Sequence, residues 1–559
     1  NIKNKYPYYT YLTCSFTSLE KPFTLLYIYS MSKKKKINKG ANSHSNKRNK
    51  KDTNKNHDTF LVGDELIGVI DVARSGDAFV IIEGKPKDFF IYRKNTNHAF
   101  DGDTVKIMRL HKPNSSRPEG IVKEVVKRCR TQFIGVVERM NDHCFVIPDN
   151  TGIKSDFYIP EARALQAKHH DKVVVELVEW RANDKNPIGK IIEILGNAGS
   201  NDIEMKSILI ENGFFTSFPK QVLDEADELE LEISEDEKKL RRDFSKIPTF
   251  TIDPADAKDF DDAISFRKLE DDLFEVGVHI ADVSHYVKEH SAMEKEAFKR
   301  ATSVYLVDRV APMFPERLSN IICSLRPNED KCCYAAVFKM NSKAVVKETW
   351  FGRTIIHSQK RFTYEDAQAI LEGNDGIFKE ELIQLNQLAH ILRQERFKNG
   401  SIGFDAPETK FKLDDNGKPI GVYVKERKDA HLLIEDFMLL ANKAVATYIG
   451  KERNKNGKIP FVYRVHDLPN EEKLIDFQLF AQKFGYKIQF DNPKQIAREL
   501  NRLMKEIEGA PEQAVLQQLA IRCMAKAEYT TNNIGHYGLG FEYYTHFTSP
   551  IRRYPDVAV

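Results

Sequence analysis

The 559-residue sequence has no long hydrophobic run, only two tryptophans and only seven cysteines. No stretch approaches the roughly 20 consecutive apolar residues that a membrane-spanning helix needs, so we exclude an integral membrane protein and expect no membrane partner. The cysteines are scattered and include no C-x-x-C pair. Such a set argues against a disulfide framework and against a zinc site, and it is typical of reduced thiols in a cytoplasmic protein.

The chain also lacks a strong excess of charge, with 85 Lys and Arg against 82 Asp and Glu, but this balance conceals a basic N-terminal arm. Residues 31–56 carry ten Lys or Arg and one Asp, and they have too few apolar residues to fold. We predict a disordered basic arm over residues 1–57, suited to a polyanionic partner or to solubility alone. Residues 1–30 precede a conventional start at Met31 and are expected not to be native.

Two successive segments have the strand and turn pattern of small β-barrels. Residues 58–125 alternate short β-branched runs with Gly, Asp and Asn turns, and residues 126–198 repeat the same order of elements. Each segment is predicted to be an OB barrel of the cold-shock type, which binds single strands by stacking bases on exposed aromatic side chains. The barrel interior is the competing location for such side chains. In the first barrel the aromatic residues are Phe79, Phe89, Phe90 and Tyr92.

The rest of the chain mixes strands and helices. The charged, helical residues 199–248 are interpreted as a linker, and residues 249–559 as one large α+β domain. Its clearest elements are a strand in LFEVGVHIADV and helices in KEELIQLNQLAHILRQERFKNG and HLLIEDFMLLANKAVATYIG. The predicted fold class is therefore multidomain, with two N-terminal all-β OB barrels followed by a large α+β domain.

Five aspartates lie within ten residues in DPADAKDFDD, directly after the strand-like TFTI. A solvated acidic loop is the usual alternative, but apolar strands enclose this run and it lacks Ser and Gly. Carboxylates this close repel one another unless cations neutralise them, and oxygen ligands without His or Cys select Mg²⁺ or Mn²⁺. In an extended segment Asp259 and Asp261 face one side and Asp262 the other, and Asp253 could close a ring around one or two ions.

Two divalent ions suit in-line displacement at phosphorus, so a phosphodiester is the natural substrate. The second dense polar motif is HFTSPIRRYPD, in which Arg552 and Arg553 lie beside Thr548 and Ser549. Guanidinium and hydroxyl groups in this arrangement could bind phosphate oxygens, with a surface salt-bridge pair as the alternative. The two barrels and the basic arm favour a single-stranded nucleic acid.

Five ordered motifs together resemble the ribonuclease II / ribonuclease R family, also called the RNB exoribonucleases. They are TIDPADAKDFDDAIS, VGVHIADVSHYV, APMFPERLSNIICSLRPNED, IEDFMLLAN and HFTSPIRRYPDV. The resemblance covers about residues 58–559. It implies a monomeric hydrolase with an RNB catalytic domain over 249–559, which degrades RNA processively from the 3′ end and releases nucleoside 5′-monophosphates. The expected partners are single-stranded RNA 3′ ends, with structured RNA as a further substrate.

The resemblance also implies roles for individual residues. Tyr305 would stack on the terminal base, Phe404 would be the opposing aromatic clamp, and Glu435 would contact the terminal ribose. Arg552 would steady the scissile phosphate, with Arg553 beside it as an RNA-binding residue. The magnesium-site carboxylates would be Asp253, Asp259, Asp261 and Asp262.

Other polar residues of the motifs have no assigned chemistry. Asp256 has no catalytic role in the family pattern, and His279 and His285 are interpreted as structural. The family pattern continues past SPIRRYPD into further helices and a third OB-type domain. We therefore expect the sequence, which ends at Val559, to be a fragment with a truncated catalytic domain.

Two other functions stay open at this point. A non-catalytic RNA-binding protein or RNA chaperone would explain the duplicated barrels and the basic arm. Clustered negative charge beside an anionic ligand gives such a protein no advantage, so the aspartates favour the nuclease. A DNA-directed nuclease is the second alternative, because contacts to the ribose 2′-OH normally separate RNA sites from DNA sites and the sequence does not show them.

Overall fold

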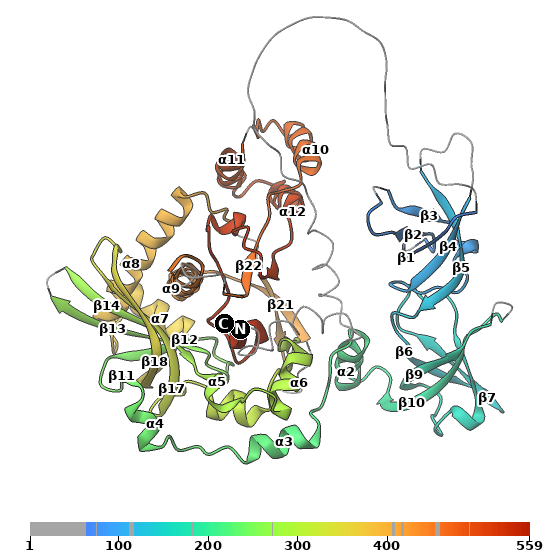
Figure 1. The fold of residues 1–559 in the computed structure, drawn as a ribbon, viewed down its shortest axis with the longest axis horizontal. Coiled ribbons are helices and arrows are strands. Elements are labelled where there is room, and N and C mark those ends of the chain that lie inside the picture. The colour runs from blue at the N-terminus through green and yellow to red at the C-terminus, as the bar shows by residue number, and fades with distance from the viewer. Residues whose placement is uncertain are drawn as a thin grey trace, which may run out of the picture. The chain divides into compact units, whose positions relative to one another are not determined.

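The computed structural model describes residues 63–559 except for 74, 86, 111–116, 182–183, 271, 405–407, 415–416, 418, 453–458 and 491. The predicted basic arm, residues 1–57, lies outside the described residues. The described chain forms two compact units, which comprise residues 63–216 and Ser217–Val559 (Figure 1). No helix within the described ranges has the length and apolar character needed to cross a membrane.

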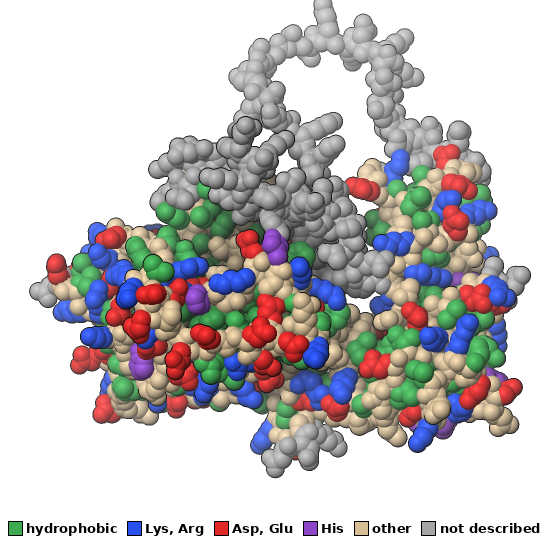
Figure 2. All heavy atoms as spheres, turned by 60° about the horizontal axis from the view of Figure 1, so that its bottom comes forward, with side chains coloured by type: hydrophobic (Ala, Val, Ile, Leu, Met, Phe, Trp, Pro, Cys, Tyr) green, Lys and Arg blue, Asp and Glu red, His purple; other side chains and the backbone are tan. Residues whose placement is uncertain are grey.

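The surface of the described residues carries charges of both signs. On the face shown in Figure 2, Asp and Glu side chains are interspersed with Lys and Arg side chains. This distribution agrees with the near-equal totals of acidic and basic residues in the sequence.

The first unit contains two closed five-stranded barrels, as predicted. The first barrel has the strand order β1-β2-β3-β5-β4, and the second has the order β10-β8-β7-β6-β9. In each barrel one strand pair is parallel, β3 with β5 and β8 with β10, and a short helical turn, η2 or η3, occupies the same place in the chain. Their bounds are β1 Glu65–Val72, β2 Ala78–Ile81, β3 Phe89–Ile91, η2 Arg93–Asn95, β4 Thr104–Leu110, β5 Glu119–Lys127, β6 Gln132–Arg139, β7 His143–Pro148, β8 Phe157–Pro160, η3 Glu161–Arg163, β9 Asp171–Glu179 and β10 Ile188–Asn197.

The aromatic residues of the first barrel divide between its interior and its surface. Phe89 is 1% exposed and belongs to the barrel core, so for this residue the barrel interior, one of the two locations left open by the sequence, is the correct one. Phe79 and Phe90 are directly opposite on β2 and β3, with ring centroids 5.4 Å apart. The second barrel repeats this pair, with Phe145 opposite Tyr158 at 5.8 Å. Each barrel therefore carries an equivalent cross-strand aromatic pair.

A seven-stranded mixed sheet organises the second unit, in the order β11-β18-β17-β14-β13-β12-β19. The outer pairs β11–β18 and β12–β19 are parallel, and the other neighbours are antiparallel. The strands are β11 Arg242–Asp243, β12 Thr249–Asp253, β13 Asp262–Glu270, β14 Leu273–Ala281, β17 Asp330–Met340, β18 Val346–His357 and β19 Lys360–Thr363. Among the described residues of this unit, three two-stranded sheets lie outside the mixed sheet: β15 Val304–Tyr305 with β16 Val310–Ala311, β20 Glu408–Leu413 with β21 Pro419–Lys425, and β22 Tyr463–Val465 with β23 Glu528–Thr530.

The long helices of the second unit agree with the sequence expectations, and the segment interpreted as a linker contains several short helices. The two predicted long helices are confirmed as α8 and α9, whereas the charged residues 199–248 form three short helices, α2, α3 and α4. The helices are α2 Asn201–Glu211, α3 Lys220–Asp227, α4 Glu235–Lys239, α5 Val283–Tyr286, α6 Ala292–Arg300, α7 Tyr364–Leu371, α8 Lys379–Lys398, α9 Asp429–Thr447, α10 Glu471–Gln482, α11 Pro493–Glu506, α12 Gln513–Cys523 and α13 Tyr554–Ala558. Shorter helical turns are η4 Arg317–Ile322, η5 Tyr448–Glu452 and η7 Tyr537–Leu539.

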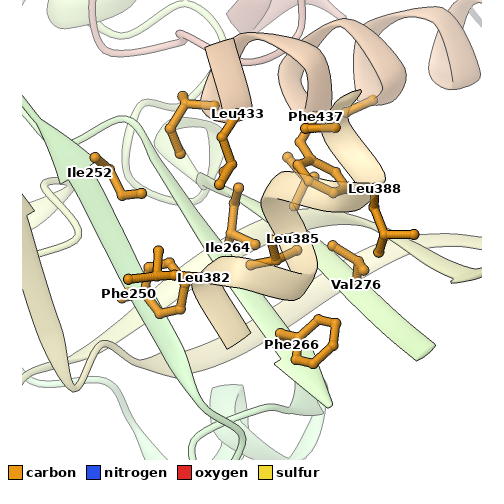
Figure 3. Close-up of a cluster of buried hydrophobic side chains, with 14 of the residues drawn as sticks. Phe250, Ile252, Ile264, Phe266, Val276, Leu382, Leu385, Leu388, Leu433 and Phe437 are labelled. Carbon is orange, nitrogen blue, oxygen red and sulfur yellow. The ribbon is translucent and has the colours of Figure 1, made fainter. Parts of the chain in front are cut away.

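Hydrophobic clusters cover both faces of the mixed sheet. On one face, side chains from β12, β13 and β14 pack against α7, α8 and α9, and Figure 3 shows Ile264 among the leucines of α8. On the other face, residues of the same sheet pack against α3, α6 and η4. Successive residues of a strand point to opposite faces. The two clusters therefore divide β17, with Ala336 and Phe338 in the first and Ala335 and Val337 in the second.

The central strand β14 is buried over almost its whole length, and its polar side chains are satisfied inside the protein. Glu275 is 2% exposed and pairs with Arg242 and Arg267, each at 2.8 Å. His279 is fully buried, and its ring nitrogens lie 2.8 Å from Ser265 Oγ and 3.0 Å from Thr354 Oγ1. This placement supports the interpretation of His279 as a structural residue.

We predict that His279 makes the unit less stable in acid. Burial lowers its pKa from the usual 6.5 to about 3. The unfolded chain binds this proton below about pH 6.5 and the folded chain does not, so His279 reduces the free energy of unfolding by up to about 1.4 kcal/mol per pH unit as the pH falls from 6.5 towards 3.

The measurement is urea unfolding at pH 7.5, 6.5 and 5.5 in a Trp180→Phe background, so that the remaining Trp350 on β18 reports on this sheet. The His279→Gln variant should be less stable than its parent at pH 7.5 but should lose less stability on acidification. An equal loss in both proteins would contradict the prediction.

Candidate active site

The aspartate run connects two adjacent antiparallel strands of the sheet. Asp253 is the last residue of β12, Asp262 is the first residue of β13, and a loop joins them. Phe260 anchors this loop because its side chain is 7% exposed and its backbone N–H donates to Ser324 Oγ at 3.0 Å. Asp256 lies on the exposed part of the loop, as expected for a residue without a catalytic role.

Asp261 is the most deeply held of these carboxylates. Its side chain accepts hydrogen bonds from the Ile551 backbone N–H at 2.9 Å and from Arg552 Nε at 3.1 Å. Burial raises the pKa of Asp261 to about 8, although the Arg552 guanidinium acts to lower it. The structure therefore joins the two motifs that the sequence analysis singled out, which lie some 290 residues apart.

Asp253 and Asp262 form a second, closely interacting pair. Burial raises the pKa of each carboxyl to about 7, and the charge of Asp253 adds to the shift at Asp262. Oδ2 of Asp253 is buried and has no hydrogen-bond partner among the described residues. Carboxyl groups whose pKa values are raised by burial and by neighbouring charges are characteristic of functional sites.

Tyr305 connects the fourth carboxylate to the arginine motif. Its hydroxyl donates to Asp259 Oδ2 at 2.8 Å, while the side chain stays 51% exposed on the β15–β16 hairpin. Burial and the Asp259 charge raise the pKa of Tyr305. The backbone of Ser303 donates to the Arg552 carbonyl at 3.0 Å, so one short pairing fixes both Tyr305 and Arg552 beside the aspartates.

Arg553 points to a different partner. Its Nε and Nη2 donate to the two carboxylate oxygens of Asp556 at 3.0 and 2.7 Å. Asp556 is 4% exposed, and it also accepts the Ser549 backbone N–H at 2.8 Å. This bidentate pair closes the turn that presents Arg552, so the structure gives Arg553 a role in shaping the turn.

Two of the expected RNA-contacting residues share no hydrogen bond or ion pair with the four aspartates among the described residues. Glu435 on α9 pairs with Arg427 and with Arg396, the latter at 3.6 Å. Phe404 is partly buried against the hydrophobic cluster of α10, α11 and α12. Their expected contacts to ribose and base stay predictions.

Tyr364, the first residue of α7, is a member of the site that the sequence analysis missed. Burial above all, and then the charges of Asp262 and Asp253, raise the pKa of Tyr364. Its ring stacks on His431 with centroids 4.0 Å apart. The parallel register that sets Asp253 opposite Thr363 brings Tyr364 to the site, and the sequence alone does not reveal that register.

The donor chemistry of the site fits a hard divalent cation, although the carboxylates are not gathered around one point. Within the described ranges, no group of three or more His, Cys, Asp or Glu is arranged to hold a metal ion. Asp259 and Asp261 are engaged by Tyr305 and Arg552. The unpartnered Asp253 oxygen and the all-oxygen donor set nevertheless match the ligands that Mg²⁺ prefers.

Comparison with known proteins assigns the family. Residues 241–559 match the model of the RNB domain, residues 68–125 that of the Ribonuclease B OB domain, and residues 145–219 that of the Cold shock domain. The chain belongs to the RNB exoribonuclease family. The matched RNB region contains the whole aspartate run and the arginine motif.

Relatives of this RNB protein support the assignment along most of the chain. Ribonuclease R 1 of Lactococcus lactis is 36% identical over 88% of this chain, which spans 62% of that protein's length. The structure of Mycoplasma genitalium RNase R in complex with ribose-methylated single-stranded RNA superposes with a TM-score of 0.82 at 26% identity, covering 88% of this chain and 78% of that one. Yeast Ssd1, described as a pseudonuclease, shares the fold, with a TM-score of 0.68 at 19% identity over 88% of this chain and 68% of that one.

The Arg553–Asp556 pair generates a test of the site. We predict that Arg553→Gln lowers the free energy of unfolding by about 2 kcal/mol, because it leaves the buried Asp556 carboxylate without its charged partner. Asp556→Asn should have a similar effect, and the double variant should cost less than the sum of the two. Urea unfolding and RNA affinity by fluorescence anisotropy are the measurements. A weaker RNA affinity with unchanged stability would instead support direct RNA binding by Arg553.

Proposed function

We propose that this chain is a hydrolytic exoribonuclease that degrades RNA processively from the 3′ end and releases nucleoside 5′-monophosphates in RNA decay. The observation that carries the proposal is the contact of Arg552 and the Ile551 N–H with Asp261, at 3.1 and 2.9 Å. It brings a phosphate-binding guanidinium next to buried carboxylates. A phosphodiester that approaches the aspartates would therefore meet a cation at the same point.

Mg²⁺, with Mn²⁺ as the alternative, is the proposed cofactor, held by Asp253, Asp259, Asp261 and Asp262. Two such ions supply an activated water and stabilise the leaving oxygen in phosphodiester hydrolysis. Arg552 is proposed to move from Asp261 to the scissile phosphate, where its fixed charge would stabilise the transition state. The exposed ring of Tyr305 would stack on the terminal base.

The remaining proposed contacts concern the RNA strand. Glu435 would bind the terminal ribose and Phe404 would pack against the last bases. The cross-strand aromatic pairs of the two barrels, Phe79–Phe90 and Phe145–Tyr158, suit the stacking of single-stranded bases. We further propose a monomer that acts in the cytoplasm, and the six free cysteines of the described chain support a reducing compartment.

The competing function is a non-catalytic RNA-binding protein. The fold alone does not decide between a nuclease and a non-catalytic binding protein, because yeast Ssd1, a pseudonuclease, shares this fold. The buried, mutually repelling aspartates favour catalysis, since a binding protein gains no affinity for an anionic ligand from them.

The proposal predicts that the Asp261→Asn variant loses RNA cleavage. A 5′-labelled single-stranded RNA of about 20 nucleotides, incubated with Mg²⁺, should shorten in single-nucleotide steps from the 3′ end. The rate should fall at least about 100-fold in Asp261→Asn, because the site loses one charge that the chemistry needs.

Asp256→Asn is the matched control, because Asp256 lies on the exposed part of the same loop, and it should retain near-parental activity. Dinucleotide products or internal cuts would contradict the exonuclease. Binding without cleavage by the parent protein would support the non-catalytic alternative, and equal cleavage of the matching DNA strand would contradict RNA specificity.

The proposed metal requirement predicts that chelation by EDTA abolishes cleavage and that Mg²⁺ or Mn²⁺ restores it. Isothermal titration with Mg²⁺ alone should show weaker binding for Asp253→Asn than for the parent, because Asp253 contributes the unpartnered oxygen. Cleavage that persists in EDTA would exclude metal-dependent hydrolysis.

A further inference from the structure

The hairpin formed by β20 and β21 is exposed along both strands. Phe411 is 47% exposed, Val422 66% and Tyr423 55%. The hairpin is a separate two-stranded sheet, and such a sheet is only marginally stable in water by itself. Its exposure beside a candidate active site raises the question of what it binds.

The register of the hairpin separates its side chains into two unlike faces. Residues directly opposite each other share a face, so Lys410 lies with Tyr423 and Phe411 lies with Val422. The first, polar face has three lysines and one tyrosine against one glutamate. We call Glu408, Lys410, Lys412, Tyr423 and Lys425 the polar hairpin face. The second face is mainly apolar and consists of Thr409, Phe411, Val422 and Val424, with Ile420 at the register shift beside them.

One end of the polar hairpin face contacts Tyr364, a residue of the candidate active site. Lys425 Nζ lies 5.5 Å from the centre of the Tyr364 ring. Tyr364 in turn follows Thr363, which the parallel register of β12 and β19 sets opposite Asp253. The base of the hairpin is therefore linked to the site through one aromatic side chain.

The tip of the hairpin lies beside a second element of the site. A methyl group on Gly417 would be 3.5 Å from the Cβ of Asp308. Asp308 belongs to the turn between β15 and β16, the hairpin that carries Tyr305. The β20–β21 hairpin thus extends from Tyr364 at its base to the Tyr305 hairpin at its tip.

We propose that the polar hairpin face binds the sugar–phosphate backbone of the single-stranded RNA whose 3′ end lies at the aspartates. This inference rests on the proposed function and adds a binding surface to it. The lysines match the charge of the backbone, and Tyr423 provides a ring on which a base can stack. The Glu408 carboxylate pairs with Lys410 at 2.9 Å and limits the charge available to the RNA.

The test measures RNA affinity as a function of salt, in EDTA to prevent cleavage. Each phosphate contact on a single strand contributes about 0.7 to the slope of log K against log salt, or about five-fold in affinity at 0.1 M salt. The variant with Lys410→Gln, Lys412→Gln and Lys425→Gln should therefore lose about two units of slope. Glu408→Gln should shift affinity the opposite way, because it releases Lys410.

Three variants serve as controls. Val422→Thr and Val424→Thr change the apolar face of the same strand, and Lys347→Gln removes an exposed lysine from β18. All three should keep the parental slope. Tyr423→Ala should weaken binding with little change in slope, since base stacking is not ionic.

The outcomes separate the two proposals. A parent protein that neither binds nor cleaves RNA would overturn the proposed function. A parent that does both, with an unchanged slope in the triple lysine variant, would overturn only the hairpin inference. Loss of affinity in the Val422→Thr and Val424→Thr variants alone would also overturn it, and would point to the apolar face as the binding surface.

Discussion

Repulsion among the aspartates of residues 253–262 is the constraint on which the second unit is built. Two carboxylates about 4 Å apart repel each other by roughly 4 kcal/mol at the effective dielectric of a protein surface. The structure opposes this repulsion with groups from distant segments. Arg552 and the Ile551 N–H hold Asp261, and the Tyr305 hydroxyl holds Asp259. Burial and the neighbouring carboxylates nevertheless keep the pKa values of Asp253, Asp261 and Asp262 raised.

These supporting groups exist only when the whole unit is folded. Residues 549–556 reach the aspartates because the bidentate Arg553–Asp556 pair shapes their turn and because Ser303 pairs with the Arg552 backbone. The loop itself depends on Phe260, which is buried in the cluster between the sheet and α6. Packing, the turn and the electrostatics of the site are thus parts of one cooperative arrangement, and damage to one of them is expected to appear in the others.

The sequence predicted the features that depend on local pattern. Apolar periodicity located α8 and α9, the continuous apolar run located β14, and the repeated strand order located two barrels. Local pattern does not decide which side of a strand faces inward, and this is why the sequence left the location of Phe89 open. It also does not give the register of parallel strands, so the approach of Tyr364 to Asp253 could not be foreseen. The partner of Arg553 was missed because adjacent arginines in a motif do not reveal which of them turns back to Asp556.

The position of Asp262 has a consequence for how the length of this chain can change during evolution. Asp262 begins β13 opposite Ile280, and Ala263 and Ile264 that follow it belong to opposite hydrophobic clusters. One residue inserted in β13 would exchange those clusters along the strand and turn the carboxylate to the other face. Homologous chains should therefore keep β13 at a constant length.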